Sequence, residues 1–167
     1  ARKAILNGLD PKKNREIPPL DYDLVRLIKR KWPELNLVLN GGINSIEQAK
    51  KELNSNQYDP DGIMMGRAAY IDPFILTNID NVFYKDKKLD HSRFDIVREM
   101  IPYIESEIAK GTYLNHITRH MLGLFHGVKG AKVWRSHLSE NAPKRKTDIN
   151  VIKEALIKIE EIQKEVA

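Results

Sequence analysis

Two glycine-containing turns are the features of this sequence whose residue types and spacing could do chemistry. Asn40–Gly42 and Gly66-Arg67 each follow a short apolar run and precede a stretch with helical spacing. Glycine lets backbone N–H groups approach an anion closely, and the start of the next helix adds a favourable dipole. Arg67 can add a charge-assisted contact to the same anion. Together the turns predict a phosphate-binding cup, with a purely structural role as the alternative for a Gly-Gly turn by itself.

The elements around these turns alternate between helix and strand. The apolar spacing and the turn residues predict, in order, a helix over 20–31, a strand over 37–39, a helix capped by Ser45 and Gln48 that runs to about 53, a strand over 62–65, and a further helix after Arg67. This order predicts parallel strands in an α/β sheet or barrel. In (β/α)8 barrels, the loops after the last two strands form a phosphate site at the C-terminal face.

Two strands cannot close a barrel, which has eight strands and typically about 250 residues. We therefore expect the first half of the chain to be the closing part of a barrel whose earlier strands lie upstream of Ala1. The second half has helical spacing only, over 93–108, 113–125, 131–138 and after Asp148. The fold class expected is thus α/β followed by all-α, with domains at 1–84 and 85–167.

The positive charge of the chain is concentrated in one segment. The 167 residues carry a net charge of +5, and eight bases but one acid lie between Lys110 and Lys146. That segment therefore carries a net charge of +7 and the rest of the chain is slightly acidic. A solvated basic face and a partner rich in phosphate, such as a nucleic acid, are the two interpretations.

Composition excludes several classes of site. The chain has no cysteine, which excludes disulfides, thiolate metal sites and a cysteine nucleophile within these residues and suits a reducing cytosol. No apolar run approaches the ~20 residues of a membrane-spanning helix. We therefore expect a cytoplasmic protein without a membrane partner.

Several other side chains have a structural role as their simplest explanation. His116 and His120 have the spacing of a metal-binding pair, but the sequence between them contains no glutamate, so helix packing or an RNA contact is favoured and no metal is expected. Trp134 and Phe125 could stack on a base, although burial between helices is favoured.

Longer motifs resemble those of one enzyme family. Ala1–Ala4, Pro11–Leu20, Asn40–Ile43 and Gly66–Tyr70 are similar to segments of tRNA-dihydrouridine synthases. The segments 111–125, 134–135 and 138–142 resemble the A subfamily in particular. The similarity runs almost from end to end and corresponds to the C-terminal half of such an enzyme.

The resemblance implies a fold, a reaction and residue roles. Members have an FMN-binding TIM barrel followed by a helical tRNA-binding domain. NADPH reduces the flavin, hydride then passes to C6 of a uracil in the tRNA D-loop, and a cysteine acid protonates C5. The residues implied to hold the FMN phosphate are Asn40, Gly41, Gly42, Gly66 and Arg67. The residues implied to contact tRNA are Lys12, Arg15, Lys132 and Arg135.

The resemblance also implies what these residues lack. The family's cysteine and most of its barrel would lie upstream, as would a histidine just before Ala1, so we expect the chain alone to be inactive. The complete enzyme is expected to be monomeric. Two alternatives stay open: a standalone RNA-binding module that kept only the helical clamp, and another phosphate-binding barrel enzyme acting on a small metabolite. The basic segment and the subfamily motifs argue against the latter.

Overall fold

The computed structural model describes residues 2–5, 7–54, 57–85, 90–144 and 147–165. They form two compact units, residues 1–68 and 69–167. The sequence predicts a domain boundary after residue 84, whereas the two compact units are divided after residue 68. The domain boundary stays a prediction. None of the described helices is both long and apolar enough to cross a bilayer.

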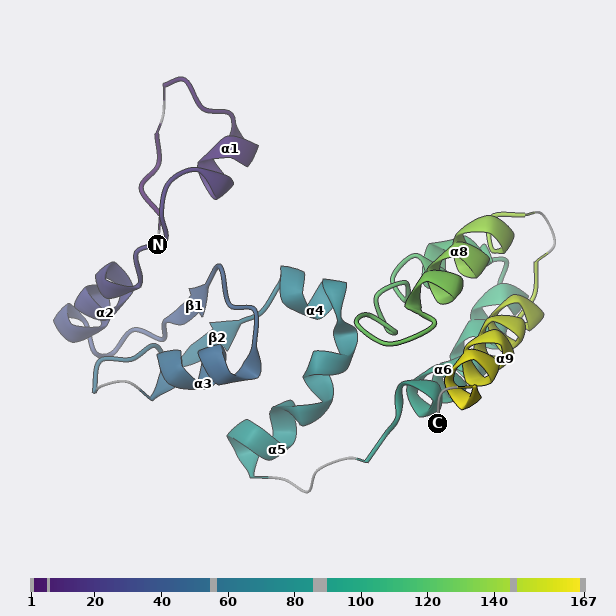
Figure 1. The fold of residues 1–167 in the computed structure, drawn as a ribbon. Coiled ribbons are helices and arrows are strands. Elements are labelled where there is room, and N and C mark those ends of the chain that lie inside the picture. The colour runs from purple at the N-terminus through teal and green to yellow at the C-terminus, as the bar shows by residue number, and fades with distance from the viewer. Residues whose placement is uncertain (1, 6, 55–56, 86–89, 145–146, 166–167) are drawn as a thin grey trace. The chain divides into compact units, whose positions relative to one another are not determined.

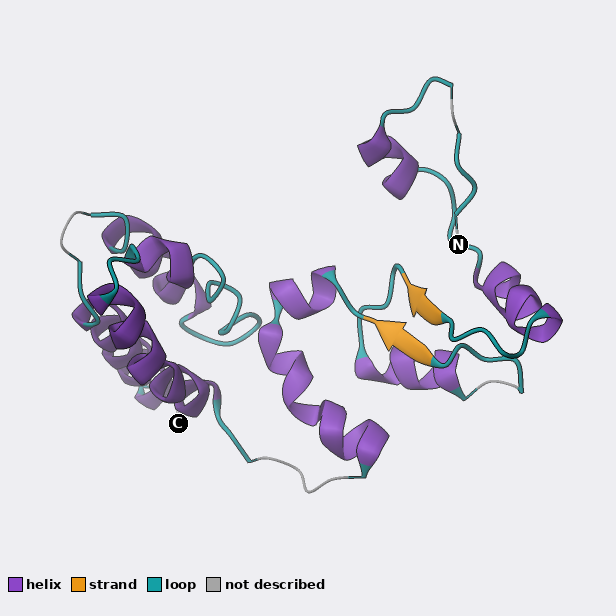
Figure 2. Cartoon of the chain, turned by 180° about the vertical axis from the view of Figure 1, so that it is seen from behind, coloured by secondary structure: helices purple, strands orange, loops and turns teal. Residues whose placement is uncertain are grey.

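The first unit contains a small parallel sheet, as the sequence predicts (Figures 1 and 2). Its elements are α1 (Pro11–Glu16), α2 (Tyr22–Lys31), β1 (Val38–Asn40), α3 (Ile46–Leu53) and β2 (Gly62–Met64), and α4 (Arg67–Ile71) begins at its end. Strands β1 and β2 pair in parallel, with Leu39 opposite Ile63. Helix α1 is not predicted from the sequence, because it has no buried residue and hence no apolar periodicity.

One face of this sheet is covered and the other is open within the unit. Leu39 is buried together with Ile43, Ile46 and Ala49, whereas the side chain of Val38 is 60% exposed. Met64 is exposed as well. Neither strand is therefore buried on both faces by the described residues of this unit. Alternating side chains point to opposite faces of a strand, and helices of this unit cover only one of the two faces.

Ion pairs and caps fix the helices of this unit. Arg26 of α2 contacts Glu52 of α3 at 2.5 Å and Asp59, just before β2, at 3.0 Å. The Ser45 hydroxyl accepts a hydrogen bond from the Gln48 N–H, as predicted. In a capping box the Gln48 side chain would also accept from the N–H of Ser45. Here it accepts instead from the N–H of Asn44, at 3.0 Å.

The second unit is helical. After α4 it contains a 3-10 helix η1 (Pro73–Asn78), α5 (Ile79–Tyr84), α6 (Arg93–Ala109), α7 (Leu114–Thr118), α8 (Ala131–Asn141) and α9 (Asn150–Lys164). Helices α8 and α9 lie side by side in both views of the chain (Figures 1 and 2). The buried core combines Val97 and Ile104 of α6 with Leu138 of α8 and with Ile152 and Ile159 of α9.

The segment predicted as one helix over 113–125 is mostly a series of turns. The helix ends at Thr118, and the following N–H groups bond to carbonyls three residues back, as from Met121 to Thr118 and from His126 to Gly123. The Met121 carbonyl accepts two hydrogen bonds, one from the Leu124 N–H at 3.0 Å and one from the indole N–H of Trp134 at 2.9 Å. Three-residue turns place apolar side chains inward at nearly the same spacing as a helix, so the pattern cannot distinguish them.

Aromatic packing around these turns confirms two predictions from the sequence. Trp134 and Phe125 are both fully buried, with ring centroids 4.9 Å apart. Phe94 of α6 meets Phe125 edge-on at 5.1 Å. Because both rings are inside the core, neither is available to stack on a base.

Candidate functional site

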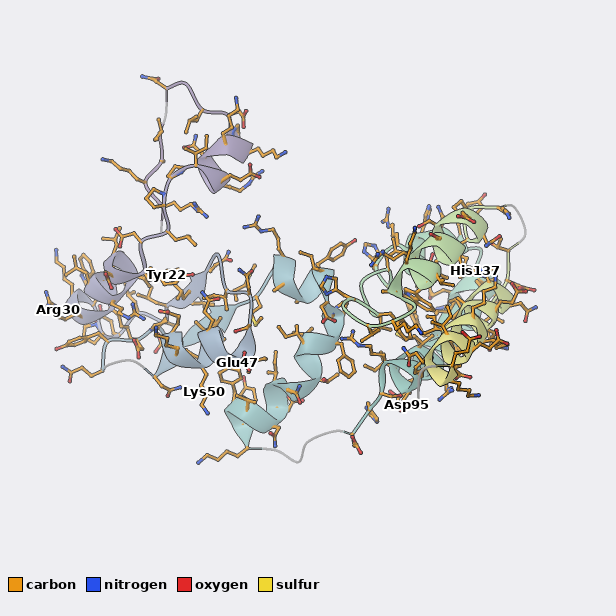
Figure 3. The ribbon with its side chains drawn as sticks, in the orientation of Figure 1. Tyr22, Arg30, Glu47, Lys50, Asp95 and His137 are labelled. Atoms are coloured by element: carbon orange, nitrogen blue, oxygen red, sulfur yellow. The ribbon has the colours of Figure 1, made fainter. Side chains whose placement is uncertain are left out.

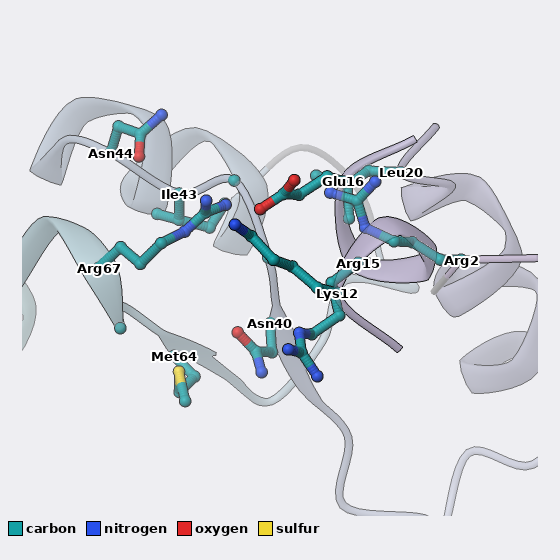
Figure 4. A pocket seen from close by; sticks show the side chains of 13 residues that line it. Arg2, Lys12, Arg15, Glu16, Leu20, Asn40, Ile43, Asn44, Met64 and Arg67 are labelled. Atoms are coloured by element: carbon teal, nitrogen blue, oxygen red, sulfur yellow. The ribbon is translucent and has the colours of Figure 1, made fainter. Parts of the chain in front are cut away.

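The predicted phosphate cup lines a pocket of about 600 Å³ in the first unit (Figure 4). Strands β1 and β2 end at Asn40 and Met64, and their carboxyl ends lie at one edge of the sheet because the strands are parallel. The turns after them therefore reach the same place. All five residues predicted to hold a phosphate line the pocket: Asn40, Gly41, Gly42, Gly66 and Arg67.

The first turn has a shape that only glycine fits well. Gly41 and Gly42 have φ values of 116° and 71°, in the region that side-chain-bearing residues rarely adopt. A Cβ on Gly41 would lie 2.8 Å from a methyl carbon of Leu20, and one on Gly42 would lie 2.6 Å from the other methyl carbon. The Tyr22 hydroxyl donates to the Gly41 carbonyl at 2.5 Å and fixes the turn from the side of α2.

The second turn contributes charge more than backbone shape. Gly66 has ordinary space around it, because a Cβ there would lie no closer than 3.6 Å to its neighbours. Arg67 begins α4, which has only five residues, so the helix dipole adds little. The guanidinium of Arg67, which points toward the pocket in Figure 4, is therefore the candidate anion-binding group of this turn.

Lys12 and Arg15 lie on the same pocket, although the resemblance assigns them to tRNA and the glycines to FMN. Both are exposed residues of α1. Together with Arg2 and Arg67 they place four cations around the pocket, where Glu16 is the one acid among the described residues that line it. Asn14 fixes this region, because its side chain accepts from the Ile5 N–H at 2.8 Å and donates to the Ile5 carbonyl at 2.9 Å. The structure thus brings together two groups that the sequence left separate.

The second predicted tRNA-binding pair lies on α8, in the helical unit. Lys132 and Arg135 are both exposed. Lys132 lines a shallow pocket of about 260 Å³ with Ser136 and His137 of α8 and with Lys158 of α9, and Glu140 is the acid that lines it. Lys158 is not predicted from the sequence, because a functional lysine on the polar face of an amphipathic helix has the same pattern as an ordinary surface lysine. Arg145 and Lys146, also part of the basic segment, lie outside the described residues.

His137, which is labelled in Figure 3, forms a hydrogen bond with Lys158 beside this pocket. The His137 side chain is 7% exposed, and Nζ of Lys158 donates to its Nδ1 at 2.9 Å. Its Nε2 lies 3.5 Å from a carboxylate oxygen of Glu154. Burial, followed by the charge of Lys158, lowers the pKa of His137 below its usual value. The imidazole is therefore neutral at pH 7, with its proton on Nε2.

The histidine pair of α7 does not form part of a metal cluster. Across the described ranges, no three His, Asp or Glu side chains are placed to share a metal ion. His116 and His120 instead each meet a tyrosine ring edge-on.

A sequence profile of the dihydrouridine synthase family matches residues 2–162. The chain belongs to the dihydrouridine synthase family. This confirms the family resemblance drawn from the motifs. The profile covers the phosphate-cup turns, α1 and the basic helix α8, so each candidate site lies within the matched region.

Several curated relatives that this chain matches share one name. It is 53% identical over 156 residues to the "tRNA-dihydrouridine(20/20a) synthase" of Escherichia coli strain K12, covering 93% of this chain and 44% of that protein. The synthase of the same name from Shewanella oneidensis is 52% identical over 153 residues, covering 92% and 44%. The one from Vibrio parahaemolyticus is 48% identical over 159 residues, covering 95% and 48%. The chain thus spans less than half the length of these relatives.

Proposed function

We propose that this chain is the C-terminal portion of an FMN- and NADPH-dependent enzyme that reduces a uridine of the tRNA D-loop to dihydrouridine. The observation that carries the proposal is the pocket at the carboxyl ends of β1 and β2, where Gly41, Gly42 and Arg67 meet in a chain of the dihydrouridine synthase family. The two parallel strands are compatible with the last strands of a TIM barrel, whose phosphate site lies at this position.

The residues of the pocket fit a phosphate group. Side chains at positions 41 and 42 would collide with Leu20, and both residues have positive φ, so the turn requires glycine at both positions. The backbone N–H groups of such a turn can approach an anion closely. Arg67 supplies a guanidinium whose paired N–H groups match phosphate oxygens. Asn40, at the end of β1, adds an amide that can donate a further hydrogen bond.

Bound FMN would supply the hydride chemistry, with NADPH as reductant and C6 of the uracil as acceptor. The 167 residues have no cysteine, so the acid that protonates C5 is not among them and we expect the chain alone to be inactive. What these residues do is bind and orient. Lys12 and Arg15 contribute positive charge at the pocket, where the RNA and the cofactor phosphate would both need it.

Lys132 and Arg135 would contact tRNA phosphates from the helical unit. Both are exposed on α8, and their spacing of three residues places them on one side of that helix. The stretch around them is rich in bases and poor in acids. Phosphate contacts position an RNA, whereas the uridine itself would be read at the barrel. The proposal includes a monomeric, cytoplasmic enzyme.

Flavin binding to the protein expressed from the complete gene tests this proposal. Arg67→Ala should weaken FMN binding roughly 10- to 150-fold, because it removes a charge-assisted contact worth roughly 1.5–3 kcal/mol. The matched control is Arg30→Ala on α2, an arginine that does not line this pocket. Unchanged FMN affinity in Arg67→Ala would refute the assignment of the cup, and weaker binding in both variants would point to general destabilisation.

A further inference from the structure

Four aromatic and imidazole rings line one exposed edge of the helical unit. Tyr113 and His116 meet edge-on with centroids 5.7 Å apart, and Tyr70 and His120 do so at 5.9 Å. Positions 113, 116 and 120 are three and four residues apart, which places them on one side of α7 and its following turn. We call these four residues the aromatic ridge.

The rings of Tyr70 and His120 are held in one orientation. Arg119 donates its Nε–H to Nε2 of His120 at 3.0 Å, and His120 Nδ1 lies 3.1 Å from the Tyr70 hydroxyl. Because an arginine N–H can only donate, Nε2 of His120 is the acceptor of this bond. A ring held by two contacts gives up little conformational freedom when it stacks on a ligand.

The ridge is open to solvent, and the stretch of sequence that carries three of its four rings contains no acidic residue. The Tyr113 and Tyr70 side chains are 66% and 59% exposed, unlike Trp134 and Phe125 in the core. No acidic residue occurs from 111 to 139, while this stretch carries Arg119 and three further bases. Glu107, the acid just before it, is paired with Lys110 at 2.7 Å.

We propose that the aromatic ridge stacks against unpaired bases of an RNA, with Arg119 close enough to contact an adjacent phosphate. Exposed rings beside positive charge and away from acids match a ligand that combines flat bases with a charged backbone. A protein partner would need no such charge. The inference rests on the proposed function and adds to it a contact that holds bases rather than phosphates.

Binding of the protein expressed from the complete gene to an unmodified tRNA transcript tests the ridge. Tyr113→Leu and Tyr70→Leu should each weaken binding roughly five- to tenfold, because each removes a stacking surface. Tyr113→Phe keeps the ring and should bind as the wild type does. Tyr84→Leu, a change of an equally exposed tyrosine on α5, is the matched control and should have no effect.

Salt dependence and a second RNA separate stacking from charge. The leucine variants should keep the slope of log K against log salt, and they should bind a fully paired RNA duplex as the wild type does. Wild-type affinity of Tyr113→Leu with Tyr70→Leu for the transcript would overturn the ridge, in favour of a protein-binding face. Equal weakening in Tyr113→Phe and Tyr113→Leu would overturn stacking as the cause.

The Lys132→Ala with Arg135→Ala variant distinguishes failure of the ridge from failure of the proposed function. Weaker binding and a shallower slope in that variant, together with unaffected ridge variants, would remove the ridge and leave the proposed function in place. If the wild-type protein expressed from the complete gene does not bind the transcript at all, both the ridge and the proposed function are overturned.

Discussion

The ammonium of Lys158 donates to Nδ1 of His137 across the α8–α9 interface at 2.9 Å. This bond needs a neutral imidazole, because a protonated ring has no acceptor at Nδ1 and would repel the lysine. Glu154, on the other side of the ring, stands one helical turn from Lys158 on α9. The pair therefore links the packing of two core helices to the protonation of one buried side chain.

This linkage predicts that acid destabilises the helical unit. The pKa of His137 is lower in the folded state than its usual 6.5, so the unfolded chain binds more protons between the two values. Stability from this group is complete above pH 6.5 and declines as pH falls toward the folded pKa. Urea unfolding at a series of pH values should show this decline, and His137→Gln should remove it.

The control for this prediction is His126→Gln, which changes an exposed histidine in the turn after α7. It should leave the acid sensitivity in place. An identical pH dependence in His137→Gln and the wild type would show that the Lys158 bond does not control stability in acid.

A second prediction concerns the two glycine turns. Gly42→Ala should destabilise the first unit and weaken FMN binding, because the residue has a φ of 71° and its Cβ would lie 2.6 Å from Leu20. The cost should be about 1–3 kcal/mol, from backbone strain and overpacking. Gly66→Ala, where the added carbon has ordinary space, should change stability by less than about 1 kcal/mol. Equal effects in chemical unfolding would contradict this account of the turns.

A third prediction compares two arginines of α6. Arg93 pairs with Asp72 at 2.8 Å, donates to the Leu124 carbonyl and lies over the Phe74 ring, and its side chain is 15% exposed. Arg93→Met should cost roughly 2–4 kcal/mol, because it leaves a half-buried carboxylate and a carbonyl without their donor.

Arg98 is the matched comparison, since its pairs with Asp95 and Glu160 involve a side chain that is 54% exposed. Arg98→Met should cost less than about 1 kcal/mol. Thermal unfolding of the two variants measures the difference, and a greater destabilisation by Arg98→Met would contradict the ranking by burial.

A fourth prediction addresses the basic helix α8. Lys132→Ala with Arg135→Ala should lower tRNA affinity and reduce the slope of log K against log salt by up to about two, at roughly 0.7–0.9 for each phosphate that the variant no longer neutralises. Flavin binding should stay as in the wild type. Binding isotherms at several salt concentrations measure the slope, and an unaltered slope would remove these residues from the RNA interface.

The sequence predicted the parts of the fold that leave a local pattern. The parallel pairing of β1 and β2 follows from the alternation of apolar runs and helical stretches, and burial of Trp134 follows from its large apolar ring on a helix that packs against others. The turns after Thr118 were not predictable, because three-residue turns and a continued helix place apolar side chains inward at nearly the same spacing. The hydrogen bond from Trp134 to the Met121 carbonyl, which supports these turns, joins residues 13 positions apart.

The candidate site divides in the same way. Glycines with positive φ after a strand are visible in the sequence as a Gly-Gly turn, so the cup at Gly41 and Gly42 could be predicted. That Lys12 lies on the same pocket could not, because α1 has no apolar face and polar contacts of Asn14 fix its position. Lys158 was equally invisible, since its importance comes from a buried histidine on another helix.

The dihydrouridine content of tRNA tests the central claim most directly. Deletion of the complete gene should remove dihydrouridine from a D-loop position of the cell's tRNA, measured by mass spectrometry of RNase fragments. The wild-type gene should restore it, and a gene carrying Arg67→Ala should restore less. An unchanged dihydrouridine content in the deletion strain, at every D-loop position, would contradict the assignment of this chain to a tRNA-reducing enzyme.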